Sequence, residues 1–247
     1  MIFTLTAKEL KSLFGSPLAW IILAILTFII AYIFISQIDA FIAVQPQLAQ
    51  IANAPGITEI IIAPLFSGVA IVLMMATPLL SMRLISEERR NRTLTLLLSA
   101  PLSMTEIILG KFFGLLIFLT ALIALAALMA LSLYAGGKLD LGLLAGNALG
   151  MLLLAACFGA LGLYISCLTA QPVIAAMGSL GALLGLWIIN LAATEPGSAL
   201  HYFSLLKHFE SFNRGLINTS DIAFYLLFIS LFLALAIHRL DQDRLRG

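Results

Sequence analysis

The chain has 247 residues, of which 62% are hydrophobic and only 10% are charged, and its formal net charge is +1. A soluble domain carries far more charge than this, so the composition excludes an ordinary soluble protein and indicates an all-α membrane protein with several spans. A net charge this close to zero also gives no basic surface that would point to nucleic acid as a partner.

The beginning of the chain predicts an amphipathic helix that lies in the membrane interface. Lys8 and Lys11 share one side of residues 1–14, and apolar side chains occupy the others. The sequence Gly15-Ser16-Pro17 then favours a turn into the membrane.

Six apolar runs predict six transmembrane helices. The expected spans are residues 18–36, 60–82, 112–134, 141–168, 173–193 and 222–237. The uncharged stretch 141–194 is too long for one span, and the turn residues 169–172 are the best place to divide it. Residues 37–59 predict a loop with room for one surface helix. Nothing indicates a second soluble domain, so we expect one membrane domain over residues 1–247.

The placement of lysine and arginine predicts that both termini are cytoplasmic. With that orientation, most of the 13 basic residues fall on the inner side. Only Lys138, Lys207 and Arg214 fall outside. Because cytoplasmic loops carry an excess of Lys and Arg, this asymmetry also places the loop 83–111 in the cytoplasm and the loop 194–221 outside.

The densest charge cluster of the sequence opens that inner loop and precedes a short amphipathic pattern. Ser86 is a candidate cap for the charged turn, while Ser103 and Glu106 fit a capping box for the next helix. Leu94 and Leu97 fall on one face of the helix expected between those caps. From physics alone, this helix has two interpretations with equal weight: it rests on the lipid surface, or it docks a soluble partner.

The spans as drawn contain no Asp, Glu, Lys, Arg or His. Ion-driven carriers and pumps usually keep ionisable groups at membrane depth, so this absence argues against that class. The chain also has no glycine-rich loop that ends in Gly-Lys-Ser/Thr, which argues against ATP hydrolysis of that kind by the chain itself. We therefore expect no catalytic, cofactor-binding or metal-binding residues.

The outer loop mixes histidine, aromatic and charged residues. His201, His208 and Glu210 could ligate a metal, but the spacing of the histidines is not that of a metal site, so we favour incidental surface histidines. Phe203 and Phe209, with Phe212, predict a short helix that dips into the outer leaflet. The alternative is an outer gate or a contact for an external partner.

The inner loop resembles the cytoplasmic signature of ABC-2 type transporter permeases. That signature has acidic and then basic residues, Gly-Thr-Leu, an apolar helix, Pro-x-Ser and a later Gly-Lys. The matching positions are Thr93, Leu94, Leu97, Leu98, Pro101, Ser103, Gly110 and Lys111. Arg92 departs from the pattern because the family has glycine there. Residues 165–171 and 208–217 also match, and the latter segment looks most like the gliding-motility-type branch and its nitrous-oxide-reductase-maturation relatives.

The resemblance implies a permease subunit in the bacterial cytoplasmic membrane, with six spans, which works beside a separate cytoplasmic ATPase dimer. ATP and Mg²⁺ would be bound by that ATPase, and a second permease chain, identical or similar, would meet this one through the first and fifth spans. The expected ATPase-coupling residues are Glu87, Glu88, Arg89, Arg90, Arg92, Thr93, Leu94, Leu97, Leu98, Pro101 and Ser103. A second cytoplasmic turn contributes Ser166, Thr169 and Gln171.

Two classes of function remain compatible with the sequence. The first is a transport or force-transmitting subunit driven by the ATPase, in which the leucines fill a groove on the partner and the charged flank steers it. The second is a passive membrane scaffold for an envelope assembly, with or without an accessory envelope protein. The substrate cannot be read from the residues.

Overall fold

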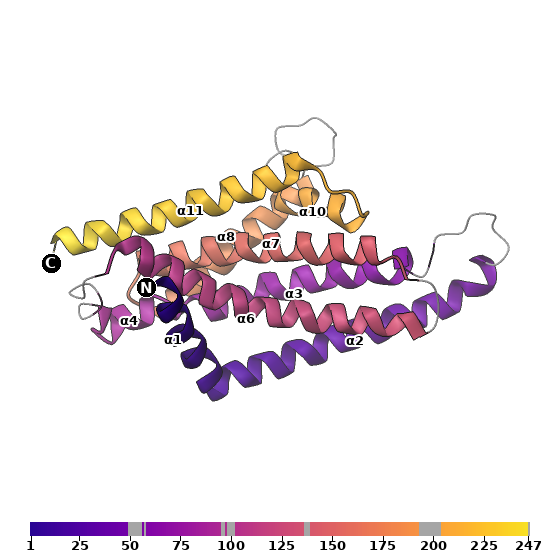
Figure 1. Cartoon of the computed structure of the whole chain (residues 1–247), viewed down its shortest axis with the longest axis horizontal. Coiled ribbons are helices and arrows are strands. Elements are labelled where there is room, and N and C mark those ends of the chain that lie inside the picture. The colour runs from indigo at the N-terminus through magenta and orange to yellow at the C-terminus, as the bar shows by residue number, and fades with distance from the viewer. Residues whose placement is uncertain are drawn as a thin grey trace.

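The computed structural model describes residues 1–48, 56, 58–94, 97, 102–135, 139–192 and 204–246. Long helices run side by side along the bundle, and a shorter N-terminal helix lies across one end (Figure 1). Within the described ranges, six helices are long and apolar enough to cross a membrane, as the sequence predicts. Both termini lie at the end of the bundle that also carries α4 (Figure 1).

The N-terminal helix α1 (Ile2–Gly15) and the first long helix α2 (Pro17–Leu48) meet at Ser16, which is extended. A residue before proline is pushed out of the helical region, so the Ser16-Pro17 pair ends one helix and starts the next. Helix α2 continues beyond residue 36 into the segment expected to be a loop, because no glycine or proline stops it before Pro46.

The middle of the bundle is formed by α3 (Ala63–Ser81), which follows the π-helical turn η1 (Thr58–Ile62), by α6 (Met104–Ser132) and by α7 (Leu141–Leu168). The short 3-10 turn η2 (Leu133–Ala135) ends α6. Ser103 and Glu106 form the predicted capping box, so α6 begins before the expected span. These three helices supply most of the hydrophobic core.

The remaining helices are α8 (Pro172–Ala192), α10 (Leu205–Asn213) and α11 (Thr219–Arg246). Helices α2, α8 and α11 are largely exposed: 17%, 17% and 22% of their most apolar windows are buried, against 72% for α7. The short helix α10 lies at the end of the bundle away from α4 (Figure 1). The bundle therefore has an inner group of helices and an outer group whose apolar sides are free to face lipid or another chain.

Candidate functional site: a charged hub around α4

The helix α4 (Ser86–Arg90) carries the charge cluster that the sequence singles out, and it follows α3 after a four-residue turn. The buried hydroxyl of Ser166, near the end of α7, holds this turn. It accepts hydrogen bonds from the backbone N–H groups of Ile85 (3.2 Å) and Ser86 (3.1 Å) and donates one to the carbonyl of Met82 (3.1 Å). One side chain thereby satisfies three backbone groups where the helix breaks.

Ser86 does not cap α4, so that prediction is wrong. Its hydroxyl donates to the carbonyl of Met82, four residues earlier, and no side-chain cap is present at the preceding Ile85. The physical reason is that the chain is already turning before α4, so Ser86 sits inside a helical turn with a carbonyl in reach. Ser166 from α7 does the capping instead.

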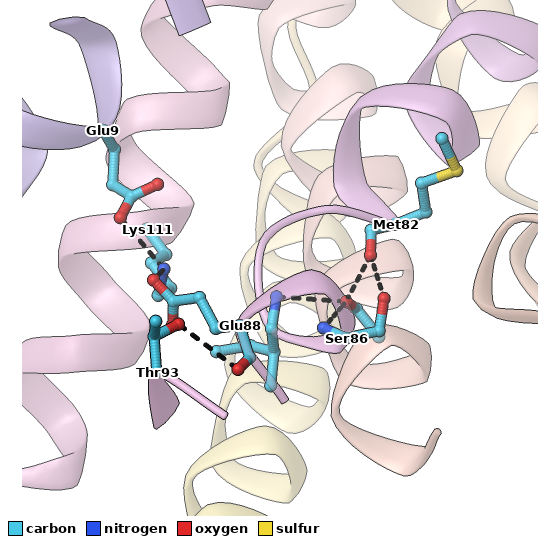
Figure 2. Close-up of polar contacts among 8 residues, drawn as sticks. Glu9, Met82, Ser86, Glu88, Thr93 and Lys111 are labelled. Carbon is cyan, nitrogen blue, oxygen red and sulfur yellow. Dashed lines mark hydrogen bonds and ion pairs between the residues drawn. The ribbon is translucent and has the colours of Figure 1, made fainter. Parts of the chain in front are cut away.

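Lys111 is the centre of a cluster of ion pairs, called the hub, that also contains Glu9, Glu88, Arg89 and Asp243. Its ammonium lies on α6, is 1% exposed, and donates to Glu9 of α1 (2.9 Å) and to Glu88 of α4 (2.7 Å). Figure 2 shows the two carboxylates meeting the amine from opposite sides. A buried ammonium is tolerated only when it is paired, so these contacts join three elements that are far apart in the sequence.

Two glycines of α6 let α1 come close enough for this pairing. A Cβ added at Gly110 would lie 2.7 Å from a methyl carbon of Leu5, and one added at Gly114 would lie 2.8 Å from the Cβ of Glu9. Small residues four apart allow two helices to cross in direct contact. The Gly110-Lys111 pair of the sequence signature thus has a local explanation: the glycine admits α1, and the lysine binds its carboxylate.

Arg89 ties α4 to two further helices. Its guanidinium donates to the carbonyl of Cys167 at the end of α7 (2.9 Å) and pairs with Asp243 of α11. Helix α4 is thus linked to α1 and α6 through Glu88, and to α7 and α11 through Arg89. A displacement of α4 cannot leave these four helices unaffected unless the ion pairs break.

The end of α4 explains the glycine of the family signature. Arg92 has a φ of 57°, in the left-handed region. The N–H of Arg92 donates to the carbonyl of Arg89 (3.2 Å), and that of Thr93 donates to the carbonyl of Glu88 (3.0 Å). This is the Schellman pattern, in which glycine is the usual residue at the left-handed position. The local turn is therefore formed here in spite of the arginine.

The outward side of α4 faces a groove of about 560 Å³. It is lined by Arg89, Arg90, Arg92 and the segment 170–173, which joins α7 to α8. The structure thus brings the predicted coupling segment to one surface with Gln171 of the turn between α7 and α8. Arg90 and Arg92 are exposed there, and the N–H of Gln171 is held by the Thr169 hydroxyl (3.1 Å).

The other predicted coupling residues divide between inward and outward positions. Leu94 is buried in its own chain and Leu97 is half-buried, so the first of these leucines is not free to enter a partner's groove. The side chain of Glu87 is 44% exposed and lies 3.8 Å from Arg83. Thr93 is exposed. Leu98 and Pro101 lie outside the described residues.

The sequence patterns did not predict that Glu9 and Asp243 belong to the hub, or that the side chain of Lys111 is buried between two carboxylates. Glu9 could have been found from the sequence, because it is the one acidic residue of α1 and follows Leu5 by one helical turn. Asp243 carried no such signal, since it sits among other charges of the tail.

At the opposite end, the predicted short helix is present as α10, and its aromatic side chains are buried against neighbouring helices. Phe209 and Phe212 are 3% and 0% exposed. His208 Nδ1 lies 2.7 Å from Asp221 Oδ1 of α11, and the hydroxyl of Tyr225 donates to the carbonyl of Leu205 (2.8 Å). His201 and Phe203 lie outside the described part. Among the residues that are described, no cluster of three His, Cys, Asp or Glu side chains could hold a metal.

Comparison with known proteins agrees with this architecture. The family model described as ABC-2 family transporter protein matches residues 3–245, which is nearly the whole chain. No curated protein matches the chain significantly. The match covers α1, the α4 hub and all six long helices, and the chain therefore belongs to the ABC-2 family of transporter proteins, as a transmembrane component.

Proposed function

We propose that this chain is the permease subunit of a bacterial cytoplasmic-membrane ABC transporter, with both termini in the cytoplasm, and that a separate ATPase drives it by docking at the arginine groove. The observation that carries the proposal is the double role of α4. Arg90 is exposed at the groove, while Glu88 and Arg89, the latter also lining the groove, bind α4 to four helices. A partner that moves α4 would move these helices with it.

The charge of the groove indicates what the docking surface of the ATPase should present. Three arginines line it, so carboxylates or the carbonyl end of a helix would be attracted there. ATP and Mg²⁺ would bind to the ATPase, and this chain would supply no catalytic group. The matching segment 208–217 supports placing the chain in the gliding-motility-type or nitrous-oxide-reductase-maturation branch, in which case the work could be transport or transmitted force.

The test is recovery of the ATPase with the tagged permease from membranes, with the ATPase identified by mass spectrometry. Arg90→Glu should reduce recovery strongly, because it places a like charge opposite the expected carboxylates, and the loss should depend on salt. Arg214→Glu is the matched control, since Arg214 is an exposed arginine at the other end of the bundle, just after α10. Equal recovery from wild type and Arg90→Glu would refute docking at this groove and favour the passive scaffold.

We further propose that two permease chains meet through α2 and α8. These two helices have exposed apolar residues at corresponding depths, because both begin at the α4 end of the bundle. Ile21 and Met177 are 58% and 71% exposed. Cysteines at these two positions should crosslink two chains, whereas cysteines at Ile21 and Ile188 lie at different depths and should not. Equal yields from both pairs, or no crosslinks in nanodiscs, would contradict this interface.

A further inference from the structure

A second cavity lies between α4 and α1, separate from the arginine groove. Its volume is about 390 Å³, within the range of small-molecule sites. It is bounded by α1, the start of α2, the end of α3, α4 and Lys111 of α6. The cavity therefore sits in the corner where the chain turns from α1, which crosses the end of the bundle, into the first long helix (Figure 1).

The lining carries balanced charge. Lys8, Arg83 and Lys111 are opposed by Glu9, Glu87 and Glu88. Lys111 is fully occupied by Glu9 and Glu88, but the other two cations are not. Among the described residues Lys8 has no ion-pair partner, and Arg83 reaches Glu87 only at 3.8 Å. Two cations, one from α1 and one from the turn after α3, are thus available to an anionic group.

One carboxylate oxygen in this lining lacks a partner. Glu88 Oε1 binds Lys111, whereas Oε2 of the same carboxylate is buried and accepts no hydrogen bond within the described part of the chain. Because Oε2 has almost no accessible surface, a ligand in the cavity does not reach it. The carboxylate of Glu87, which also lines the cavity, is 44% exposed and lies 3.8 Å from Arg83, so it is the acceptor that a ligand N–H can meet.

Besides the polar Ser12, Ser16 and Asn91, the rest of the lining is apolar and includes exposed leucines of two long helices. Leu13 closes it on the α1 side, and Leu18 of α2 and Leu79 of α3 line the cavity while being 41% and 47% exposed. Both helices are candidate membrane spans. A ligand could place a polar head among the charges and an apolar chain along these leucines.

We propose that this cavity binds the headgroup of a zwitterionic phospholipid whose amine is a primary ammonium, such as phosphatidylethanolamine. The phosphate is held by Lys8 and Arg83, the ammonium donates to the exposed carboxylate of Glu87, and an acyl chain runs along Leu18 and Leu79. An anionic headgroup brings no cation to Glu87 while it draws Arg83 away, and a quaternary choline has no N–H to give the Glu87 carboxylate. The lipid would bridge α1 and α4 beside Lys111, and its binding does not depend on an ATPase.

Native mass spectrometry of the detergent-purified full chain tests the proposal. Equal amounts of phosphatidylethanolamine, phosphatidylcholine and phosphatidylglycerol of the same chain length are added, and retained lipid is counted. The ethanolamine lipid should be retained about tenfold more strongly than the choline lipid, the factor that one charge-assisted hydrogen bond gives. Equal retention of the two zwitterionic lipids would overturn the proposal.

Variants separate this site from general lipid adhesion. Lys8→Met combined with Arg83→Met should lower the affinity for the ethanolamine lipid about tenfold or more, because both phosphate contacts are lost. Lys11→Met is the control, since Lys11 is an exposed lysine of α1 that does not line the cavity. An unchanged double variant, or an equal loss in the control, would overturn the site.

Glycerophosphoethanolamine, which lacks acyl chains, should compete poorly; competition as strong as that of the lipid would exclude a membrane source for the ligand.

Discussion

The two short helices, α4 at one end of the bundle and α10 at the other, are packed by different sets of contacts. Helix α4 is held by ion pairs and by a hydroxyl that serves three backbone groups, all contributed by other helices. Helix α10 combines ring packing with polar contacts. Phe212 lies against Gly150 of α7, and His208 both stacks on Phe224 and lies 2.7 Å from Asp221. Ion pairs fix the register between distant segments, whereas ring packing tolerates small shifts. The difference suggests that the α4 end transmits displacement and the α10 end closes the bundle.

The largest expected effect comes from removing the charge at the centre of the hub. Lys111→Met leaves Glu9 and Glu88 facing each other without a cation and should cost about 3–5 kcal/mol of stability. Folded yield and melting temperature in detergent measure this. Lys207→Met is the control, because its partner Glu210 is 47% exposed and such surface pairs contribute about 0–1 kcal/mol. If the two variants have the same melting temperature, the ion pairs of the hub do not stabilise the α4 end of the bundle.

A second variant tests the other end separately. Gly150→Ala would place a Cβ 2.6 Å from the Cβ of Phe212, which is 0% exposed, so α10 must shift at a cost of about 1–3 kcal/mol. Recovery of the ATPase should stay at the wild-type level, because the change is confined to the α10 end. A stable variant that nevertheless loses the ATPase would contradict the division of labour between the ends.

The smallest expected effect is a gain in the stability of the permease, not a loss. Arg92→Gly places glycine at the left-handed position after α4 and should stabilise the permease by about 1 kcal/mol. Arg90→Gly is the matched control two residues earlier, where the helical position makes glycine unfavourable by about 1 kcal/mol. Melting temperatures of the permease alone should therefore move in opposite directions. If both melting temperatures fell, the left-handed conformation at position 92 would not limit the stability of this turn.

The residue pattern predicts the long helices well because membrane spans depend on composition, which is local. Residues 141–168 match α7 for this reason. Hub membership depends instead on contacts between remote segments, which no local pattern encodes. Glu88 and Arg89 adjoin Arg90 in the same charged run. The first two form ion pairs within the chain, although Arg89 also lines the groove, whereas Arg90 is exposed at the groove. Only the placement of α1, α7 and α11 around α4 separates these roles.

The central claim is that the hub carries movement of the ATPase to α1. The triple variant Glu9→Gln, Glu88→Gln, Lys111→Met removes all three charges together, so no unpaired charge is buried and the fold should persist. A spin label at Lys11, an exposed position of α1, reports its distance to a second label at Arg214 with and without a non-hydrolysable ATP analogue on the docked ATPase. The account predicts a nucleotide-dependent change in wild type and none in the triple variant, with equal ATPase recovery from both. The same distance change in both proteins would contradict it.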